Sequence, residues 1–172
     1  MRWDCAFLLP RCEVLIANRF EAGKLTGRDD PAEAATRLGG RVGIVTLGRD
    51  GRVVAAGATL ARYAAQRVTA VDTTGAGDTF AGVLVAIMVP GMNLASAIIA
   101  AQSAAALAVT RHGCFGAMPT RCELNEIIMI YGNTRAETTR PKSLRVNPSY
   151  NNDHRCRPPT RYRHFTPEML SQ

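Results

Sequence analysis

The sequence predicts an α/β fold in which strands alternate with helices and the sheet is largely parallel. Three observations support this prediction. Short apolar runs recur along the chain, segments of helical length separate them, and glycine, proline or asparagine stands at the joints. Ligands of such folds bind beyond the carboxyl ends of the strands, so the loops at those ends are the first candidates for a functional site.

The first part of the chain predicts one strand and two helices. Residues 14–17 form an apolar run typical of a buried strand, and a short helix over residues 18–25 should end at Thr26-Gly27. A second helix should begin at Asp30-Pro31, because the aspartate can cap it and proline suits a first turn whose N–H groups have no helical acceptor. It should end at Gly39-Gly40.

Three further strands are expected in the middle of the chain. Residues 42–47 are mostly apolar, and the turn at 49–51 contains Asp-Gly, which favours a tight hairpin. Residues 52–56 would then form the returning strand. Residues 67–71 should form the last strand, which leads into a glycine-rich loop.

Two long helices are expected after that loop. The first should begin near Ala76 and end before Pro90, and Asn93 should cap the second, which runs to about Val109. The two helices are apolar, but Pro90-Gly91 and Asn93 divide them into pieces too short to span a membrane. We therefore expect no membrane partner.

Charge and composition divide the chain into a body and a tail. The 172 residues carry a formal net charge of +7, and the tail holds eight Lys/Arg against three Asp/Glu, whereas the body holds thirteen against eleven. The tail's five prolines and few aliphatic residues cannot bury enough apolar surface to offset its ordering entropy. We expect a folded body over residues 1–130 and a basic, disordered tail over residues 131–172.

The cysteines and histidines indicate neither a disulfide framework nor a metal centre. The five cysteines are odd in number and have no C-x-x-C spacing, and His112, His154 and His164 have no ligand spacing. The N-terminus lacks the long apolar core of a signal peptide. Reduced thiols in a cytoplasmic protein are therefore expected.

Residues 72–82 are the most informative segment. They read Asp-Thr-Thr-Gly-Ala-Gly-Asp-Thr-Phe-Ala-Gly and join an expected strand to an expected helix. Gly75 and Gly77 let the backbone approach a ligand, and the helix start offers unpaired N–H groups and the positive end of a dipole. A carboxylate beside this anion site, at Asp78, is suited to accept a proton from an attacking hydroxyl.

This run resembles the C-terminal signature of the ribokinase/PfkB family of carbohydrate kinases. Three other segments match in the family's order: residues 18–21 resemble its N-x-x-E element, residues 45–51 its T-L-G-x-x-G loop, and residues 104–119 the segment that closes the nucleotide and cation sites. The resemblance covers roughly residues 12–122. It implies the C-terminal portion of a ribokinase-like three-layer α/β/α fold with a mostly parallel sheet, without the family's N-terminal half and lid.

The resemblance implies ATP-dependent phosphoryl transfer to a sugar hydroxyl, with Asp78 as the general base at the substrate. The amides of Gly75, Ala76 and Gly77 would form the anion hole for the transferring group. Ribose is the first choice of sugar, and fructose, another sugar or a nucleoside stays open. A homodimer is one option for the assembly.

ATP and Mg²⁺ are the cofactors that the resemblance implies. Asn18 would approach the phosphates and Glu21 would organise waters around Mg²⁺, although the residues alone indicate a helix cap and a solvated face. Gln102 would help to line the nucleotide pocket, or it is an ordinary polar position on an alanine-rich helix. The rest of the implied pocket comprises Thr46, Leu47, Gly48, Arg49, Asp50, Gly51, Gly77 and Asp78.

A K⁺ site is also implied by the resemblance, because carboxylate and carbonyl oxygens suit a hard cation. Its ligands would be Asp72, the carbonyls of Thr74, Ala108, Arg111 and Gly113, and the position of Ala117. Family members often have serine at this last position, so one side-chain oxygen is absent here.

Two other functions stay open. The chain could be a truncated kinase that binds nucleotide weakly or serves a partner, because about half of the family's fold is absent. Arg157, Arg161 and Arg163 lie near Tyr162 and Phe165, a pattern compatible with nucleic-acid binding, but a solvated tail explains it better.

Overall fold

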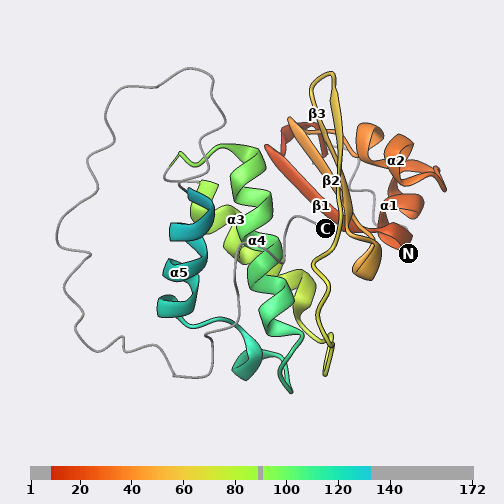
Figure 1. The fold of residues 1–172 in the computed structure, drawn as a ribbon. Helices are drawn as coiled ribbons and strands as arrows, with labels where there is room; N and C mark the ends of the chain where they lie inside the picture. The colour runs from red at the N-terminus through yellow and green to blue at the C-terminus, as the bar shows by residue number, and fades with distance from the viewer. Residues whose placement is uncertain (1–8, 89–90, 133–172) are drawn as a thin grey trace.

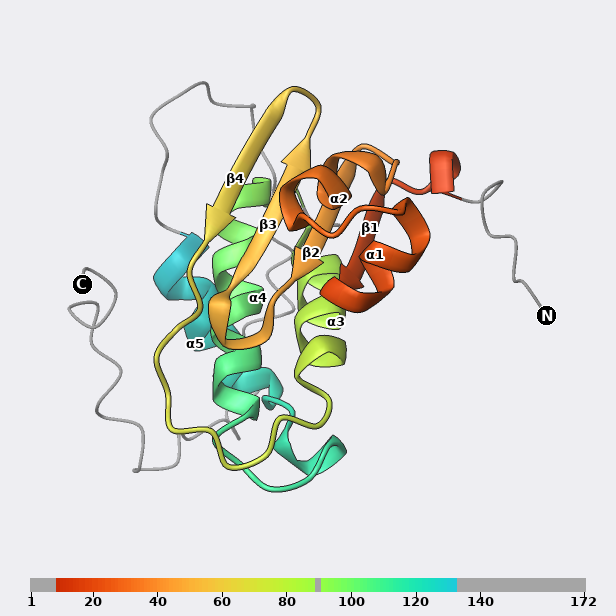
Figure 2. The same cartoon turned by 90° about the vertical axis from the view of Figure 1, so that its right-hand side faces the viewer.

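A four-stranded sheet lies between two pairs of helices (Figures 1 and 2). This computed structural model describes residues 9–88 and 91–132. The strands are β1 (Val14–Asn18), β2 (Val42–Thr46), β3 (Arg52–Ala56) and β4 (Thr59–Tyr63), in that order across the sheet. One face is covered by α1 (Arg19–Thr26) and α2 (Pro31–Arg37), and the other by α3 (Ala76–Met88) and α4 (Leu94–Ala108). Helix α5 (Arg121–Gly132) lies on the side of α4 away from the sheet.

These layers confirm the expected fold class. Strands β1 and β2 pair in parallel, whereas β2 pairs with β3 and β3 with β4 in antiparallel register. In the described part of the chain, parallel pairing is thus limited to the β1–β2 contact, so the expectation of a mostly parallel sheet is wrong for these four strands. Three short 3₁₀ turns complete the described structure: Leu9–Arg11, Gly48–Asp50 and Phe115–Ala117.

The predicted helix boundaries in the body depend on local caps, and the structure contains those caps. Asp30 Oδ1 accepts the amides of Ala32 and Glu33 at 2.9 and 3.0 Å, at the start of α2. Asn93 Oδ1 accepts the amide of Ser96 at 2.9 Å, at the start of α4. Each cap satisfies helix N–H groups that have no partner within the helix.

The predicted strand over residues 67–71 is wrong. These residues pass the end of α4 instead, where the amides of Val71 and Asp72 donate to the Val109 carbonyl at 2.7 and 3.2 Å. Their partner is therefore a carbonyl at a helix end and not a neighbouring strand. The fourth strand is β4, which the sequence analysis did not predict, and it follows β3 through the two residues Gly57 and Ala58.

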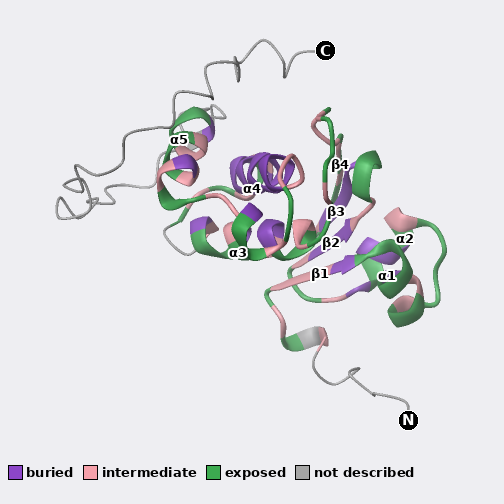
Figure 3. Cartoon of the chain, turned by 90° about the horizontal axis from the view of Figure 1, so that it is seen from below, coloured by how far each residue is buried: buried purple, intermediate pink, exposed green. Residues whose placement is uncertain are grey.

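The core has two parts, one on each face of the sheet. Ile44 and Val54 are register partners that face α3 and α4, and Val45 and Val53 are the next pair, which faces α1 and α2. This is the side-chain alternation that a strand imposes. Figure 3 shows that α4 is buried along nearly its whole length, because the sheet, α3 and α5 surround it.

Several expectations concern the cysteines, membrane spans and the tail. Cys12 and Cys114 form no disulfide, but Cys122 is disulfide-bonded, so the expectation of reduced thiols is wrong at that position. No helix in the described ranges is long and apolar enough to cross a membrane. Residues 131 and 132, the first of the expected tail, belong to α5, and Tyr131 is buried, so the tail begins later than expected. The rest of the expected tail, from residue 133 onward, lies outside the described residues, and its disorder stays a prediction.

Candidate active site

A cavity of about 320 Å³ lies between the β2–β3 loop, the start of α3 and the middle of α4. It brings together several residues that the sequence predicted at the nucleotide site, from segments far apart in the chain: Thr46, Gly48, Arg49, Gly51, Ala76, Gly77 and Gln102. Leu47, Asp50 and Asp78 belong to the same loops but do not line the cavity. The structure thus assembles most of the predicted pocket from three segments.

The β2–β3 loop has five residues, 47–51, and is not the tight hairpin that Asp50-Gly51 suggested. A hydrogen bond of 2.8 Å from the Leu47 amide to the Gly51 carbonyl closes it, and a 3₁₀ turn fills the space between. Gly51 has a φ of 87°, and a Cβ atom there would collide with the Tyr63 carbonyl of β4. Glycine is required at this position for both reasons, and the result is a wall of bare backbone beside the cavity.

The loop that begins α3 is held against the α4–α5 connection. Gly75 has a φ of 76°, and a Cβ atom there would collide with the Cys114 thiol. The Ala76 amide donates to Thr73 at 3.2 Å, whereas the amides of Gly75 and Gly77 donate to no protein acceptor in the described residues. Two of the three predicted anion-hole donors are therefore open to a ligand.

Asp78 lies in the first turn of α3, directly after Gly77. Its side chain is exposed and has no hydrogen-bond partner among the described residues. An exposed carboxylate in the first turn of this helix, next to the two open amides, is accessible to a hydroxyl that could give it a proton.

Asn18 and Glu21 contact each other and do not line the cavity. Asn18 Oδ1 accepts the Glu21 amide, and Glu21 Oε2 accepts the Asn18 amide, each at 2.9 Å. This reciprocal pair is a capping box at the start of α1. The helix cap suggested by the residues alone is present, and the phosphate and Mg²⁺ roles stay predictions.

Asp72 joins the two loops that were predicted to surround K⁺. Its Oδ1 accepts the Thr74 amide at 2.9 Å and its Oδ2 accepts the Gly113 amide at 3.0 Å. These bonds, from Thr74 first, hold the pKa of Asp72 down to about 2. The carboxylate is therefore ionised at neutral pH, between loops that carry several of the predicted carbonyl ligands.

The other predicted ligands of this site lie on the α4–α5 connection. The Ala108 carbonyl accepts the Arg111 amide at 3.1 Å, and Ala117 is buried in the turn Phe115–Ala117. Among the described residues, no group of three or more His, Cys, Asp or Glu side chains could hold a metal ion. A cation here would therefore depend on backbone carbonyls with Asp72, which suits a weakly charged hard ion.

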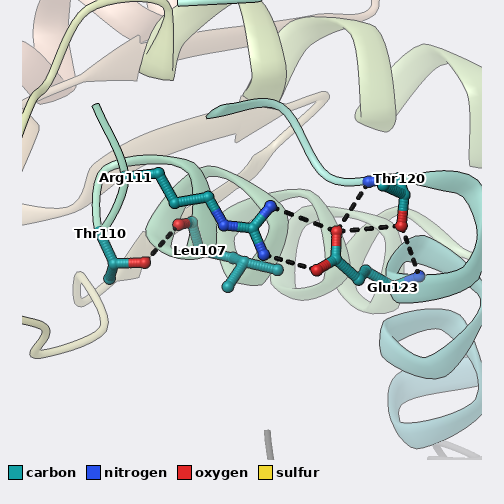
Figure 4. Close-up of polar contacts among 5 residues, drawn as sticks. All are labelled: Leu107, Thr110, Arg111, Thr120 and Glu123. Atoms are coloured by element: carbon teal, nitrogen blue, oxygen red, sulfur yellow. Dashed lines mark hydrogen bonds and ion pairs between the residues drawn. The ribbon is translucent and has the colours of Figure 1, made fainter. Parts of the chain in front are cut away.

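A partly buried ion pair fixes the connection that carries those ligands (Figure 4). Arg111 donates to both carboxylate oxygens of Glu123, at 2.5 and 3.3 Å, and the amide and hydroxyl of Thr120 donate to Glu123 Oε2 at 2.8 and 3.0 Å. Burial alone would raise the pKa of Glu123, but the bonds from Arg111 and Thr120 outweigh it and lower that pKa. The sequence analysis did not predict this network.

The cavity also contains polar residues that the sequence analysis missed. Arg52, the first residue of β3, and Gln66, in the segment after β4, line it beside Gln102. Arg52 lies with its guanidinium carbon 3.9 Å from the centre of the Phe80 ring. The only signal in the sequence was an arginine that begins an otherwise apolar strand.

Comparison with known proteins identifies the family. The model of the pfkB family carbohydrate kinase matches residues 2–121. The chain belongs to the pfkB carbohydrate kinase family. The match contains both glycine-rich loops, Asp78 and every predicted metal-site residue, so the resemblance first seen in short motifs extends over most of the folded body.

Individual relatives agree with this assignment. The chain is 32% identical to a ribokinase from Staphylococcus aureus (strain COL) over 129 residues, which cover 70% of this chain and 42% of the relative. It is 36% identical to a fructokinase from Klebsiella pneumoniae over 114 residues, which cover 60% of this chain and 37% of the relative. The chain thus spans less than half the length of these family members.

The solved structure of Arabidopsis thaliana ribokinase complexed with ribose and ATP shares the fold. It superposes with a TM-score of 0.63 at 28% identity, and the match covers 70% of this chain and 42% of that one. The expected ribokinase-like α/β fold is therefore confirmed for the matched part.

Proposed function

We propose that this chain contributes the nucleotide-binding and phosphoryl-transfer part of a pfkB-type sugar kinase. The observation that carries the proposal is the single cavity that joins the β2–β3 loop to the start of α3, where two backbone amides are open to an anion. A nucleotide in the cavity would place its phosphates at these amides, because the helix dipole and the unpaired N–H groups favour negative charge there.

Asp78 is the proposed general base. It would take the proton from a sugar hydroxyl while the hydroxyl oxygen bonds to the γ-phosphorus of ATP and the bond to the β-phosphate oxygen breaks, which releases ADP. The amides of Gly75 and Gly77 would stabilise the charge on the transferring group. Ribose is the preferred acceptor, since ribokinases are among the relatives, and fructose is the next choice.

The proposed metal ions are Mg²⁺ and K⁺. Glu21 is exposed at the start of α1 and would orient waters around Mg²⁺ that is held mainly by the nucleotide phosphates. Asp72 and the carbonyls of the 108–113 loop offer the oxygen ligands that fit K⁺. When bound, Mg²⁺ would neutralise phosphate charge, and K⁺ would hold the two loops beside the anion hole in one arrangement.

Nucleotide binding without catalysis is the second candidate. It is favoured by the exposure of Asp78, because no described residue orients this carboxylate toward an acceptor. Much of the rate of a two-substrate reaction comes from positioning, so a base without such support is a poor catalyst. We expect the isolated chain to bind nucleotide and to phosphorylate sugar slowly or not at all.

Asp78→Asn, compared with the exposed Asp29→Asn as a charge-matched control, separates these two candidates. Calorimetry with MgATP and a coupled assay with ribose and with fructose would be run on both variants and the parent chain. If the chain is catalytic, Asp78→Asn should lower turnover by about 10²–10⁴-fold and leave ATP affinity unchanged. Equal turnover in the parent and in Asp78→Asn would contradict the assignment of the base.

A further inference from the structure

The floor of the cavity contains three polar groups whose hydrogen bonds the protein does not complete. Arg52 is only 7% exposed, and its Nε and Nη1 atoms have no acceptor in the described part of the chain. The Oε1 atoms of Gln66 and Gln102 are likewise buried without a donor. All three residues line the same cavity. Buried polar atoms in this condition are uncommon, because each costs the desolvation energy of a lost hydrogen bond.

The neighbours of the two glutamines fix which amide atom is left open. Gln102 Nε2 lies 2.5 Å from the Ala64 carbonyl, which can only accept, so the NH₂ group must point there. Gln66 Nε2 lies 2.6 Å from the Ser103 hydroxyl, which already donates to the Ile99 carbonyl and can therefore only accept. Both side chains thus leave a carbonyl oxygen open, and neither can be flipped without the loss of an existing bond.

Phe80 compensates the charge of Arg52 but not its hydrogen bonds. The guanidinium carbon lies 3.9 Å from the ring centre, so the positive charge rests on the negative face of the ring. Burial nevertheless lowers the pKa of Arg52 to about 10, which leaves the group charged at neutral pH. The N–H groups at the guanidinium edge still lack acceptors, and a neutral ligand atom with a lone pair would complete them.

We propose that Arg52, Gln66 and Gln102 recognise the edge of an aminopurine base, as specificity determinants of the donor nucleotide. Arg52 donates to a ring nitrogen or carbonyl oxygen of the base, and the two glutamine oxygens accept from its N–H groups. Adenine and guanine each carry an acceptor together with at least two N–H hydrogens at one edge. Hypoxanthine has the acceptor but only one such hydrogen at that edge. This inference rests on the proposed nucleotide cavity and extends it to the choice of base.

The test measures binding of three ligands, each with Mg²⁺, to the full chain by calorimetry: ATP, ITP and inorganic tripolyphosphate. The variants are Arg52→Met and the control Arg62→Met. Arg62 is exposed on the neighbouring strand β4, pairs with Val53 and lies outside the cavity, so its loss removes the same charge elsewhere. Arg52→Lys is a third variant, which keeps the charge but not the planar fork of donors.

The parent chain should bind ATP about 5- to 100-fold more tightly than ITP, because ITP leaves one glutamine oxygen unpaired. Arg52→Met should bind ATP about 10-fold more weakly than the parent and should bind tripolyphosphate equally well, whereas Arg62→Met should match the parent for all three ligands. Arg52→Lys should also lose ATP affinity, and it provides the same readout if Arg52→Met does not fold.

Five outcomes would overturn the inference. Equal binding of ATP and ITP by the parent, or parent-like ATP affinity in both Arg52 variants, would show that these groups do not read the base. An equal loss of ATP and tripolyphosphate affinity in Arg52→Met would assign Arg52 to the phosphates. If the chain binds tripolyphosphate as tightly as it binds ATP, base recognition is refuted but the proposed phosphate site stands. If the chain binds none of the three ligands, the proposed function is refuted as well.

Discussion

Two arginines, the buried Arg52 and the partly buried Arg111, differ in what surrounds them. Arg111 has both oxygens of Glu123 as acceptors, and Thr120 completes the same carboxylate. Arg52 has an aromatic ring beneath it and a cavity in front of it, but no described acceptor for two of its nitrogens. An arginine whose N–H groups all find acceptors within the protein supports the fold. An arginine with unpaired N–H groups beside a cavity is available to a ligand.

The largest expected effect comes from breaking the ion pair between Arg111 and Glu123. Glu123→Ala should lower the free energy of unfolding by about 3 kcal/mol, because it leaves Arg111 largely buried without its counter-ion and removes the cap of α5. Chemical denaturation would measure it. Glu126→Ala, an exposed position on the same helix, is the control and should change stability by less than about 0.5 kcal/mol. Similar losses in the two variants would show that the ion pair contributes little.

A change in stability of the opposite sign is expected at Arg52. Arg52→Met should leave the ligand-free chain unchanged or more stable by about 1 kcal/mol, because it removes two unsatisfied buried donors and keeps an apolar side chain against Phe80. The same denaturation experiment, without nucleotide, measures this difference. A loss as large as that of Glu123→Ala would remove the contrast between the two arginines and assign Arg52 to the support of the fold.

The smallest effect concerns acid. The pKa of Asp72 is about 2 in the folded chain, below the value near 3.9 expected when unfolded, so its contribution to stability is complete above about pH 4. That contribution should fall as the pH drops from about 4 to 2, where the unfolded chain binds a proton first. Asp72→Asn should flatten the stability profile in this interval, as thermal melts at successive pH values would record. An unchanged slope would mean that Asp72 does not couple the two loops.

The parts of the fold that the sequence predicted are those that local chemistry determines. Asp30 and Asn93 cap their helices whatever lies around them, and Gly75 is demanded by the backbone of its own loop. The strand expected over residues 67–71 failed because the Val71 amide donates to the Val109 carbonyl at the end of α4 and not to a neighbouring strand. The sequence of an apolar run does not show which hydrogen-bond partner its backbone will meet. Helix α5 was missed, since its start depends on the Thr120 and Glu123 bonds.

The candidate site divides in the same way. The glycine-rich loops were recognisable because the residues of each motif are consecutive in the sequence. The structure brings most of these residues to one cavity. Arg52 and Gln66 could not be predicted, since their significance depends on what is absent around them. The side of the sheet on which the Arg52 side chain lies is known only once the strand register is known. The absence of hydrogen-bond partners for a buried atom can be seen only in the packed structure.

The burial of α4 has a mechanical consequence. Twelve of its fifteen residues are buried, and most of these twelve are alanines. Because protein interiors are close-packed, we expect the helix to be rigid between the sheet and α5. Gln102 and the Ala108 carbonyl are six residues apart, which fixes them about 9 Å from each other along the axis. The helix therefore acts as a rigid spacer that holds Gln102 and the Ala108 carbonyl at a constant separation.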